Sequence, residues 1–306
     1  MTIAIIISLF ASFLWAVTNH IDKFLINGAN GSTYSVKTLL VFSTLISGLV
    51  LSPIWLIISN FSVSISTISL IAVLISSVIY VLATFLYFKA LEKSDVSIVV
   101  VMFQLIPVFS FILAFILFKE SLTVNQLIGS IIIILSAVII SFNFEEKNNK
   151  SNFKALFLMT LSSLFYASYF ILFDVAIRHS SFNSCAFWYQ MGFVLIGIVL
   201  ICIRSFRETF IKTIKENGKK FISLNITNEV MNLSANLLVN FANVSISIAL
   251  VNVLNGFQGA FVFILGVIGV ILLPKYFKED LRKWVLIQKI GCIILSIIGL
   301  LVMFIK

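Results

Sequence analysis

Phe109-Ser110-Phe111-Ile112-Leu113 returns later in the chain as Phe261-Val262-Phe263-Ile264-Leu265. The flanking segments return in the same order, with Ser97-Ile98, Lys119-Glu120-Ser121-Leu122 and Gln126-Leu127-Ile128-Gly129 matched by Ser247-Ile248, Lys278-Glu279-Asp280-Leu281 and Gln288-Lys289-Ile290-Gly291. A weaker echo of Phe13-Leu14-Trp15-Ala16 in Leu164-Phe165-Tyr166-Ala167 sets the repeat at about 150 residues. The chain therefore consists of two related halves.

The composition places both halves in a lipid bilayer. Of the 306 residues, 60% are hydrophobic and 11% are charged, and the mean hydropathy is +1.15. That leaves too little polar surface to cover a water-soluble globule of this length. Because each half is almost entirely apolar, the two must share one bundle. We expect a multi-pass protein of the inner or plasma membrane.

Apolar stretches near the length of about 20 residues that crosses a bilayer as a helix recur along the chain. We expect ten such spans, at approximately 3–25, 36–58, 67–90, 96–118, 124–142, 155–177, 183–203, 221–242, 246–273 and 284–304. The first repeat then covers residues 1–142, a polar connecting loop 143–154, and the second repeat 155–306. The runs lack period-two alternation, so the predicted fold is all-α. Since each half holds an odd number of spans, the two copies are expected to be inverted.

The basic residues are distributed unevenly between the two sides of this arrangement. Eighteen of the 21 Lys and Arg residues lie in loops on the side away from the N-terminus, and the other three are Lys119, Arg178 and Lys306. Cytoplasmic loops of membrane proteins carry the excess of Lys and Arg. The pattern predicts that both termini lie outside the cytoplasm.

A stripe of amides marks the expected span at 221–242. Asn225, Asn228, Asn232, Asn236, Asn240 and Asn243 follow one another at helical spacing, and Glu229 falls within the stripe. Such groups are too costly to face lipid, so they either hydrogen-bond neighbouring helices or line a polar pathway. We favour the pathway, with Glu229 as a possible proton-coupling residue, because intramembrane carboxyl groups are commonly functional.

Other polar residues within spans extend this candidate cavity. Asn252 and Asn255 share one side of the ninth span with glycines, where close helix packing is the alternative explanation. Gln104 lies three residues before Pro107, which leaves backbone groups of the helix without their usual hydrogen bonds. The Gln104 amide can bind these groups and line the cavity; the alternative is that the segment is only a helix kink.

The first span contributes Trp15 and Asn19 to the candidate cavity. Lys23, near the end of this span, and Asp174, in the related part of the second half, are candidate gate residues at opposite mouths. An interfacial anchor is the alternative for Lys23.

Several functional classes find little support. The two histidines, His20 and His179, belong to no catalytic or metal motif, and Cys185, Cys202 and Cys292 are scattered singly. We therefore expect no enzyme activity, metal or other cofactor. The basic residues accompany no nucleic-acid motif, so the expected partners are a small-molecule solute and the lipid bilayer. The oligomeric state is not predicted.

The chain resembles the EamA-type proteins of the drug/metabolite transporter superfamily. The resemblance is carried by Ala90-Leu91-Glu92-Lys93-Ser94, Phe103-Gln104-Leu105-Ile106-Pro107-Val108-Phe109, Lys119-Glu120-Ser121-Leu122-Thr123 and Gln126-Leu127-Ile128-Gly129. It implies ten helices in two inverted halves, a central cavity and alternating access, with Glu120 and Gly129 in structural roles. It also implies termini in the cytoplasm, opposite to the charge pattern.

The residues and the resemblance together favour a secondary transporter that moves a small metabolite or drug-like solute by alternating access, with export and proton coupling as hypotheses. Two alternatives remain open: a flippase for a lipid-linked headgroup, and a membrane-embedded enzyme or scaffold.

Overall fold

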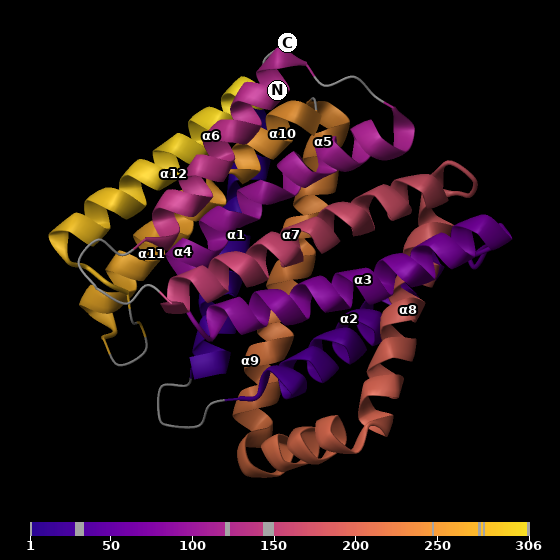
Figure 1. Ribbon diagram of the computed structural model, residues 1–306. Helices are drawn as coiled ribbons and strands as arrows, with labels where there is room; N and C mark the ends of the chain where they lie inside the picture. Colours follow the sequence, from indigo (N-terminus) through magenta and orange to yellow (C-terminus); the bar gives the residue numbers. More distant parts are fainter. Residues whose placement is uncertain are drawn as a thin grey trace.

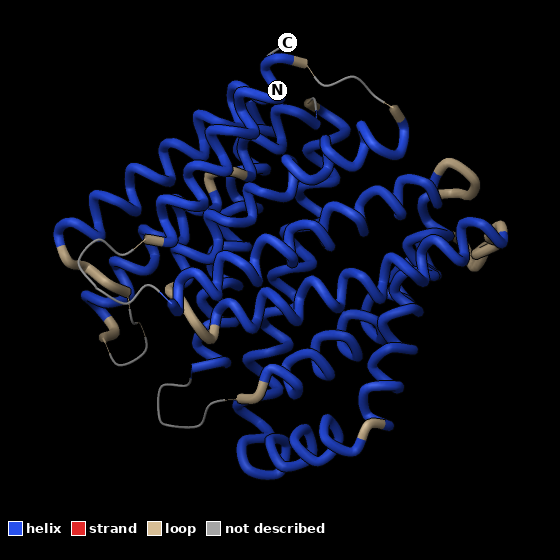
Figure 2. Tube along the Cα trace, in the orientation of Figure 1, coloured by secondary structure: helices blue, strands red, loops and turns tan. Residues whose placement is uncertain are grey.

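The computed structural model describes residues 2–27, 34–119, 123–142, 150–246, 248–274, 277 and 279–304. These residues form helices and short connections and contain no strand, as Figure 2 shows. The helices are α1 (Thr2–Asn27), α2 (Val36–Ile58), α3 (Thr67–Leu91), α4 (Val96–Val101), η1 (Met102–Gln104), α5 (Leu105–Phe118), α6 (Val124–Ser141), α7 (Lys150–Ile177), α8 (Phe182–Cys202), α9 (Arg204–Ser245), α10 (Ile248–Asn255), α11 (Gln258–Leu272) and α12 (Lys283–Phe304).

Part of the sequence-based expectation lies outside the described residues. This holds for 143–149 of the connecting loop, for the motif residues Glu120–Leu122 and Lys278, and for the side chains of Asn240 and Asn243. The connection is shorter than expected, because α7 already begins at Lys150.

Within the described residues, nine helical segments are long and apolar enough to cross a membrane. The expected span at 221–242 is not among them. It forms the later part of α9, a helix of 42 residues. Its amides and Glu229 lower the hydropathy of a segment that otherwise has the length to cross.

Residues 204–220, which lie between two expected spans, are continuous with this later part. In Figure 1, α9 first runs along the end of the molecule opposite the labelled termini and then turns into the bundle. The later part carries its apolar side chains outward, since Ile226, Val230, Leu237 and Phe241 are exposed.

Two of the expected spans are broken helices. In the first half, α4 and α5 are joined through the 3-10 turn η1, close to Pro107. In the second half, α10 and α11 are separated by Gly256 and Phe257, which form a turn. The breaks lie at related positions of the two repeats, although only the first is accompanied by a proline.

The two halves interlock through pairs of packed helices. The pair α3 and α7, the pair α2 and α8, the pair α6 and α12, and the pair α1 and α9 each join one half to the other. Between α6 and α12, a Cβ atom added to Gly129 would lie 2.5 Å from the carbonyl oxygen of Gly299. Only glycine permits this approach, so the packing explains why Gly129 occupies its place.

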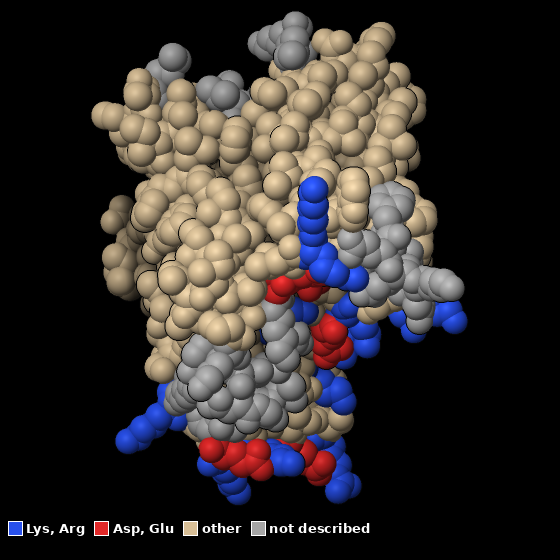
Figure 3. All heavy atoms as spheres, turned by 90° about the vertical axis from the view of Figure 1, so that its left-hand side faces the viewer, with Lys and Arg blue, Asp and Glu red and all other residues tan. Residues whose placement is uncertain are grey.

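The charged side chains gather toward one end of the bundle. On the face in Figure 3, the Lys, Arg, Asp and Glu residues lie in the lower part, and the described surface above them is uncharged. The labelled N- and C-termini lie together at the upper end in Figure 1.

Candidate functional site

The half-buried carboxyl group of Asp22 joins three helices of the bundle. Asn228 of α9 donates from Nδ2 to Asp22 Oδ1 at 2.7 Å, and the hydroxyl of Tyr87 in α3 donates to Asp22 Oδ2 at 3.0 Å. Both carboxylate oxygens of Asp22 on α1 therefore accept a hydrogen bond, one from a donor in each half of the protein.

The hydrogen bonds continue from Tyr87 to a fourth helix. Asn19 donates from Nδ2 to the Tyr87 hydroxyl at 2.8 Å, and Gln258 of α11 donates to Asn19 Oδ1 at 2.7 Å. We call Asn19, Asp22, Tyr87, Asn228 and Gln258 the Asp22 cluster. A network in which each member orients the next restrains the geometry of α1, α3, α9 and α11.

Glu229 is the second carboxyl group in this region. It is 7% exposed, and Ser47 of α2 donates a hydrogen bond to its Oε2 at 2.8 Å. Ser43, one helical turn earlier, is a second hydrogen-bonding neighbour. Among the described residues, no basic side chain is hydrogen-bonded to either Asp22 or Glu229. A buried acid, Glu229, and a half-buried one, Asp22, are costly as anions without a cationic partner, which makes them candidates for binding a proton or a cation.

One buried acceptor beside these acids has no partner. Asn228 is 7% exposed, and while its Nδ2 serves Asp22, its Oδ1 accepts no hydrogen bond within the described structure. A buried acceptor without a donor is uncommon and costs free energy. A ligand with a donor group would satisfy it.

The asparagines of the amide stripe lie in two different environments along α9, one in contact with α1 and one exposed. Asn232 accepts a hydrogen bond from Trp15 Nε1 at 3.0 Å, which joins α9 to α1. Asn236, which the stripe predicts to face the interior, is exposed, and its Nδ2 donates at 2.7 Å to the Asn232 carbonyl oxygen of its own helix. Its amide is satisfied without a neighbouring helix, and its place on a polar pathway stays a prediction.

The candidate residues near the helix breaks lie together. Ser12 donates to Asn255 Oδ1 at 3.3 Å, so Asn255 joins α10 to α1. A Cβ atom added to Gly256 would lie 3.7 Å from Gln104 Oε1, which places the breaks of the two halves against each other. Gln104 is buried, Asn252 is half-buried, and neither side chain forms a hydrogen bond in the described part of the chain.

The two candidate gate residues have partners of their own. Lys23 donates to the carbonyl oxygens of Leu91 and, at 2.7 Å, Ser94, and so neutralises the negative end of α3. Asp174 forms an exposed ion pair with Arg178 at 2.6 Å on the last turns of α7. These contacts fit helix-end stabilisation and do not bring either residue to the Asp22 cluster.

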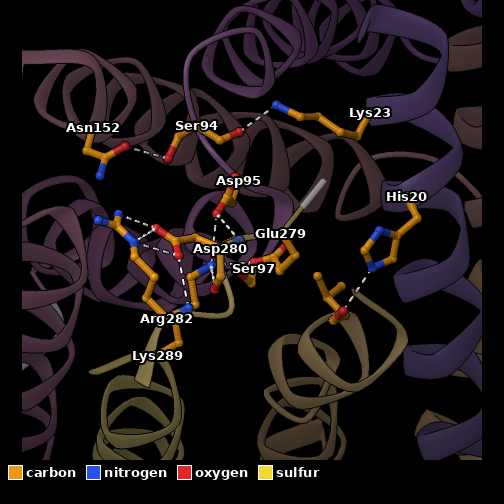
Figure 4. A network of polar contacts seen from close by, with 11 residues as sticks. His20, Lys23, Ser94, Asp95, Ser97, Asn152, Glu279, Asp280, Arg282 and Lys289 are labelled. Carbon is orange, nitrogen blue, oxygen red and sulfur yellow. Dashed lines mark hydrogen bonds and ion pairs between the residues drawn. The ribbon is translucent and has the colours of Figure 1, made fainter. Parts of the chain in front are cut away.

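A buried ionic network joins the halves at the end of the bundle that carries the charges (Figure 4). Lys289 Nζ lies 2.5 Å from Glu279 Oε1 and 2.8 Å from Asp95 Oδ2, and Ser97 donates to the same Glu279 oxygen. Lys289 is 1% exposed. Burial raises the pKa of the Glu279 carboxyl group, the Asp95 charge raises it further, and Lys289 opposes both. The pairing of Lys289 with two acids compensates the buried charge.

A hollow of about 230 Å³ opens beside this network, and its walls include Lys93, Asn152 and Gln288. None of the cavity residues predicted from the sequence lines it.

Aromatic rings extend inward from the Asp22 cluster. The ring of Tyr87 lies 5.1 Å from that of Phe103, which lies 5.9 Å from Tyr166, and Tyr166 meets Tyr80 edge-to-face at 5.3 Å. Tyr80 also contacts Tyr169 edge-to-face at 5.2 Å. The rings come from α3, η1 and α7, so they cross from one half to the other.

Sequence reasoning missed three features: Tyr87, the place of Asp22 in a hydrogen-bond network between helices, and the ionic network. Tyr87 looks like any aromatic residue in an apolar span, and Asp22 looks like an anchor near a helix end. For Asp95, Glu279 and Lys289 a signal existed, because opposite charges at span ends on the same side can pair across the bundle.

The comparisons with known proteins agree with this architecture. Residues 2–142 match the model of the EamA-like transporter family. Twenty-five chains of solved structures match, and one, titled "Crystal structure of protein", is 12% identical over 99% of this chain and 96% of its own, with a TM-score of 0.52. At that identity it speaks for the fold alone. No curated protein matches. The family match supports a membrane transporter of the drug/metabolite transporter superfamily rather than an enzyme. The first repeat of the chain, residues 2–142, is thus similar to the EamA-like transporter family.

Proposed function

We propose that the protein is a secondary transporter that moves a small solute by alternating access of two inverted halves, with Asp22 and Glu229 as the coupling or substrate-binding acids. The observation that carries the proposal is that Asp22 of the first half is hydrogen-bonded to Asn228 of the second, while the adjacent Glu229 is hydrogen-bonded to Ser47 of the first. Neither acid has a basic hydrogen-bond partner among the described residues. Such acids are expected on proton and substrate pathways. Because the site is formed by both halves, their relative motion changes it.

The packing pairs support an inverted ten-span arrangement. We number the spans in chain order, with the later part of α9 as the eighth, so that each span of the first half corresponds to the span five places later. Replacing each span by its counterpart then turns the packed pair of α3 and α7 into the packed pair of α9 and α1. The pairs α2 with α8 and α6 with α12 convert into themselves. The broken helices α4–η1–α5 and α10–α11 also exchange. Discontinuous helices at matching positions of two repeats are typical of transporter binding sites.

The later part of α9 has the features of a membrane span, which would bring the nine apolar spans to ten. Its exposed apolar side chains, among them Val230 and Leu237, suit lipid, and its polar side chains Asn225, Asn228 and Glu229 are buried. An amphipathic helix of this kind is stable in a bilayer when its polar face is covered by protein.

The charge asymmetry predicts that both termini lie outside the cytoplasm. A phosphatase that folds only outside the cytoplasm, fused after the last residue, is expected to be active. A fluorescent protein that folds only inside is expected to stay dark when fused at the same place. The reverse result would overturn this orientation and would favour the one implied by the family.

The transport proposal is tested with proteoliposomes that contain the full chain and an internal pH dye. After an outward or inward pH gradient is imposed, soluble cationic, zwitterionic, neutral and anionic solutes are added one at a time. At least one class is expected to collapse the gradient in proteoliposomes and not in empty liposomes. Transfer of a fluorescent phospholipid between leaflets without movement of any soluble solute would instead favour the flippase.

A further inference from the structure

The chemistry around Asp22 and Glu229 also limits what the site can hold. We propose that it binds an organic cation with N–H donors and a flat apolar body, such as a primary aryl-alkylamine; this inference rests on the transport function proposed above. It concerns Asp22 on α1, Tyr87 on α3, Asn228 and Glu229 on α9, and the aromatic rings that adjoin Tyr87.

Charge is the first argument. Glu229 is buried and Asp22 is half-buried, and Asn228, which donates to Asp22, is the neighbour of Glu229 on α9. Lys23, the next residue after Asp22, donates to carbonyl oxygens at the end of α3 instead. The described surroundings of the two acids thus offer negative charge and no compensating cation. A solute anion would be repelled in a low-dielectric interior, whereas a cation would be attracted.

Hydrogen-bonding capacity is the second argument. Each oxygen of Asp22 accepts one hydrogen bond in the structure and has capacity for a further one. Asn228 Oδ1, on the same side chain that donates to Asp22, is a buried acceptor without a donor. The site is therefore rich in acceptors, which an ammonium group with three N–H donors satisfies and a quaternary ammonium group does not.

The aromatic rings are the third argument. Tyr87 touches Asp22 with its hydroxyl and Phe103 with its ring, so the carboxylate continues directly into the aromatic group of Phe103, Tyr166 and Tyr80. Ring faces attract cations and pack against flat apolar groups. A solute with its ammonium at Asp22 and Asn228 would extend its apolar body along these rings.

The test uses four ligands of one shape: 2-phenylethylammonium, its N,N,N-trimethyl derivative, 2-phenylethanol and 3-phenylpropanoate. Binding to the purified full chain is measured by calorimetry in detergent, and flux is measured in proteoliposomes. We expect the primary ammonium to bind at least about ten-fold more tightly than the trimethyl derivative, because the latter cannot donate to Asn228 or Asp22. The alcohol and the carboxylate are expected to show no measurable binding.

Two variants complete the test. Asp22→Asn and Glu229→Gln are each expected to weaken binding of the primary ammonium by about ten-fold or more. Glu208→Gln removes the same charge from an exposed ion pair with Arg204 and is expected to bind like the wild type. The ligand series on the wild type remains decisive if a variant fails to fold.

The outcomes separate this inference from the proposed function. Equal affinity for the trimethyl derivative would overturn the role of the N–H donors. Transport of an anionic or neutral solute with no response to any cation would overturn the inference and keep the transporter. The absence of flux for every soluble solute would overturn both.

Discussion

Lys289→Met is expected to destabilise the protein by about 3–5 kcal/mol, because it leaves two acids without their cation in a buried site. Glu279 has a side chain only 2% exposed and faces Lys289 at 2.5 Å, so water cannot replace the lost partner. A methionine fills a similar volume but offers no charge. The change is measured as the shift in the thermal or denaturant midpoint of the purified protein in detergent.

Two controls separate the buried charge from the loss of a side chain. The double variant Lys289→Met, Glu279→Gln is expected to recover most of the stability, because glutamine can still accept the hydrogen bond from Ser97 and carries no charge. Arg282→Met removes a cation from an exposed pair with Asp280 and is expected to change stability by less than about 1 kcal/mol. If Lys289→Met matched Arg282→Met, the network would have no role in stability.

The fold could be read from the sequence to a large extent because hydrophobic length and repetition are local signals. Nine expected spans correspond to helical segments that qualify as membrane-crossing. The later part of α9 shows where hydropathy alone fails, since the residues that make it informative, such as Glu229, also make it polar. The break at Gly256 was not predicted, because the second copy lacks the proline that marks the first.

The candidate site was harder to predict because its contacts join distant parts of the chain. Asp22 and Asn228 are 206 residues apart, and Asp95 and Lys289 are 194 apart. Helical periodicity indicates which residues share a face of one helix, but it does not indicate which helix faces it. Periodicity singled out Glu229 and Asn232. Tyr87 is part of the candidate site only because α3 packs against α1, which periodicity does not reveal.

Glu229→Gln is expected to lower proton-coupled flux at least about ten-fold while leaving the fold intact. Glutamine is close in size to glutamate and can accept the hydrogen bond from Ser47, so the contact between α9 and α2 is preserved. It cannot gain or lose a proton in the physiological range. If Glu229 carries the coupling proton, both the rate and its dependence on the pH gradient are therefore lost in proteoliposomes.

Asp22→Asn distinguishes whether one acid or two take part in coupling. Asparagine keeps the size of the side chain but replaces one acceptor by a donor, and the Tyr87 hydroxyl can turn from donor to acceptor to accommodate it. The variant should therefore fold, which size-exclusion profiles check, and the flux then reports on charge. Loss of gradient-dependent flux in both variants, with Glu208→Gln unchanged, would mean that coupling needs both carboxyl groups. Wild-type flux with unchanged pH dependence in both variants would exclude these carboxyl groups from coupling and leave them a role in helix packing only.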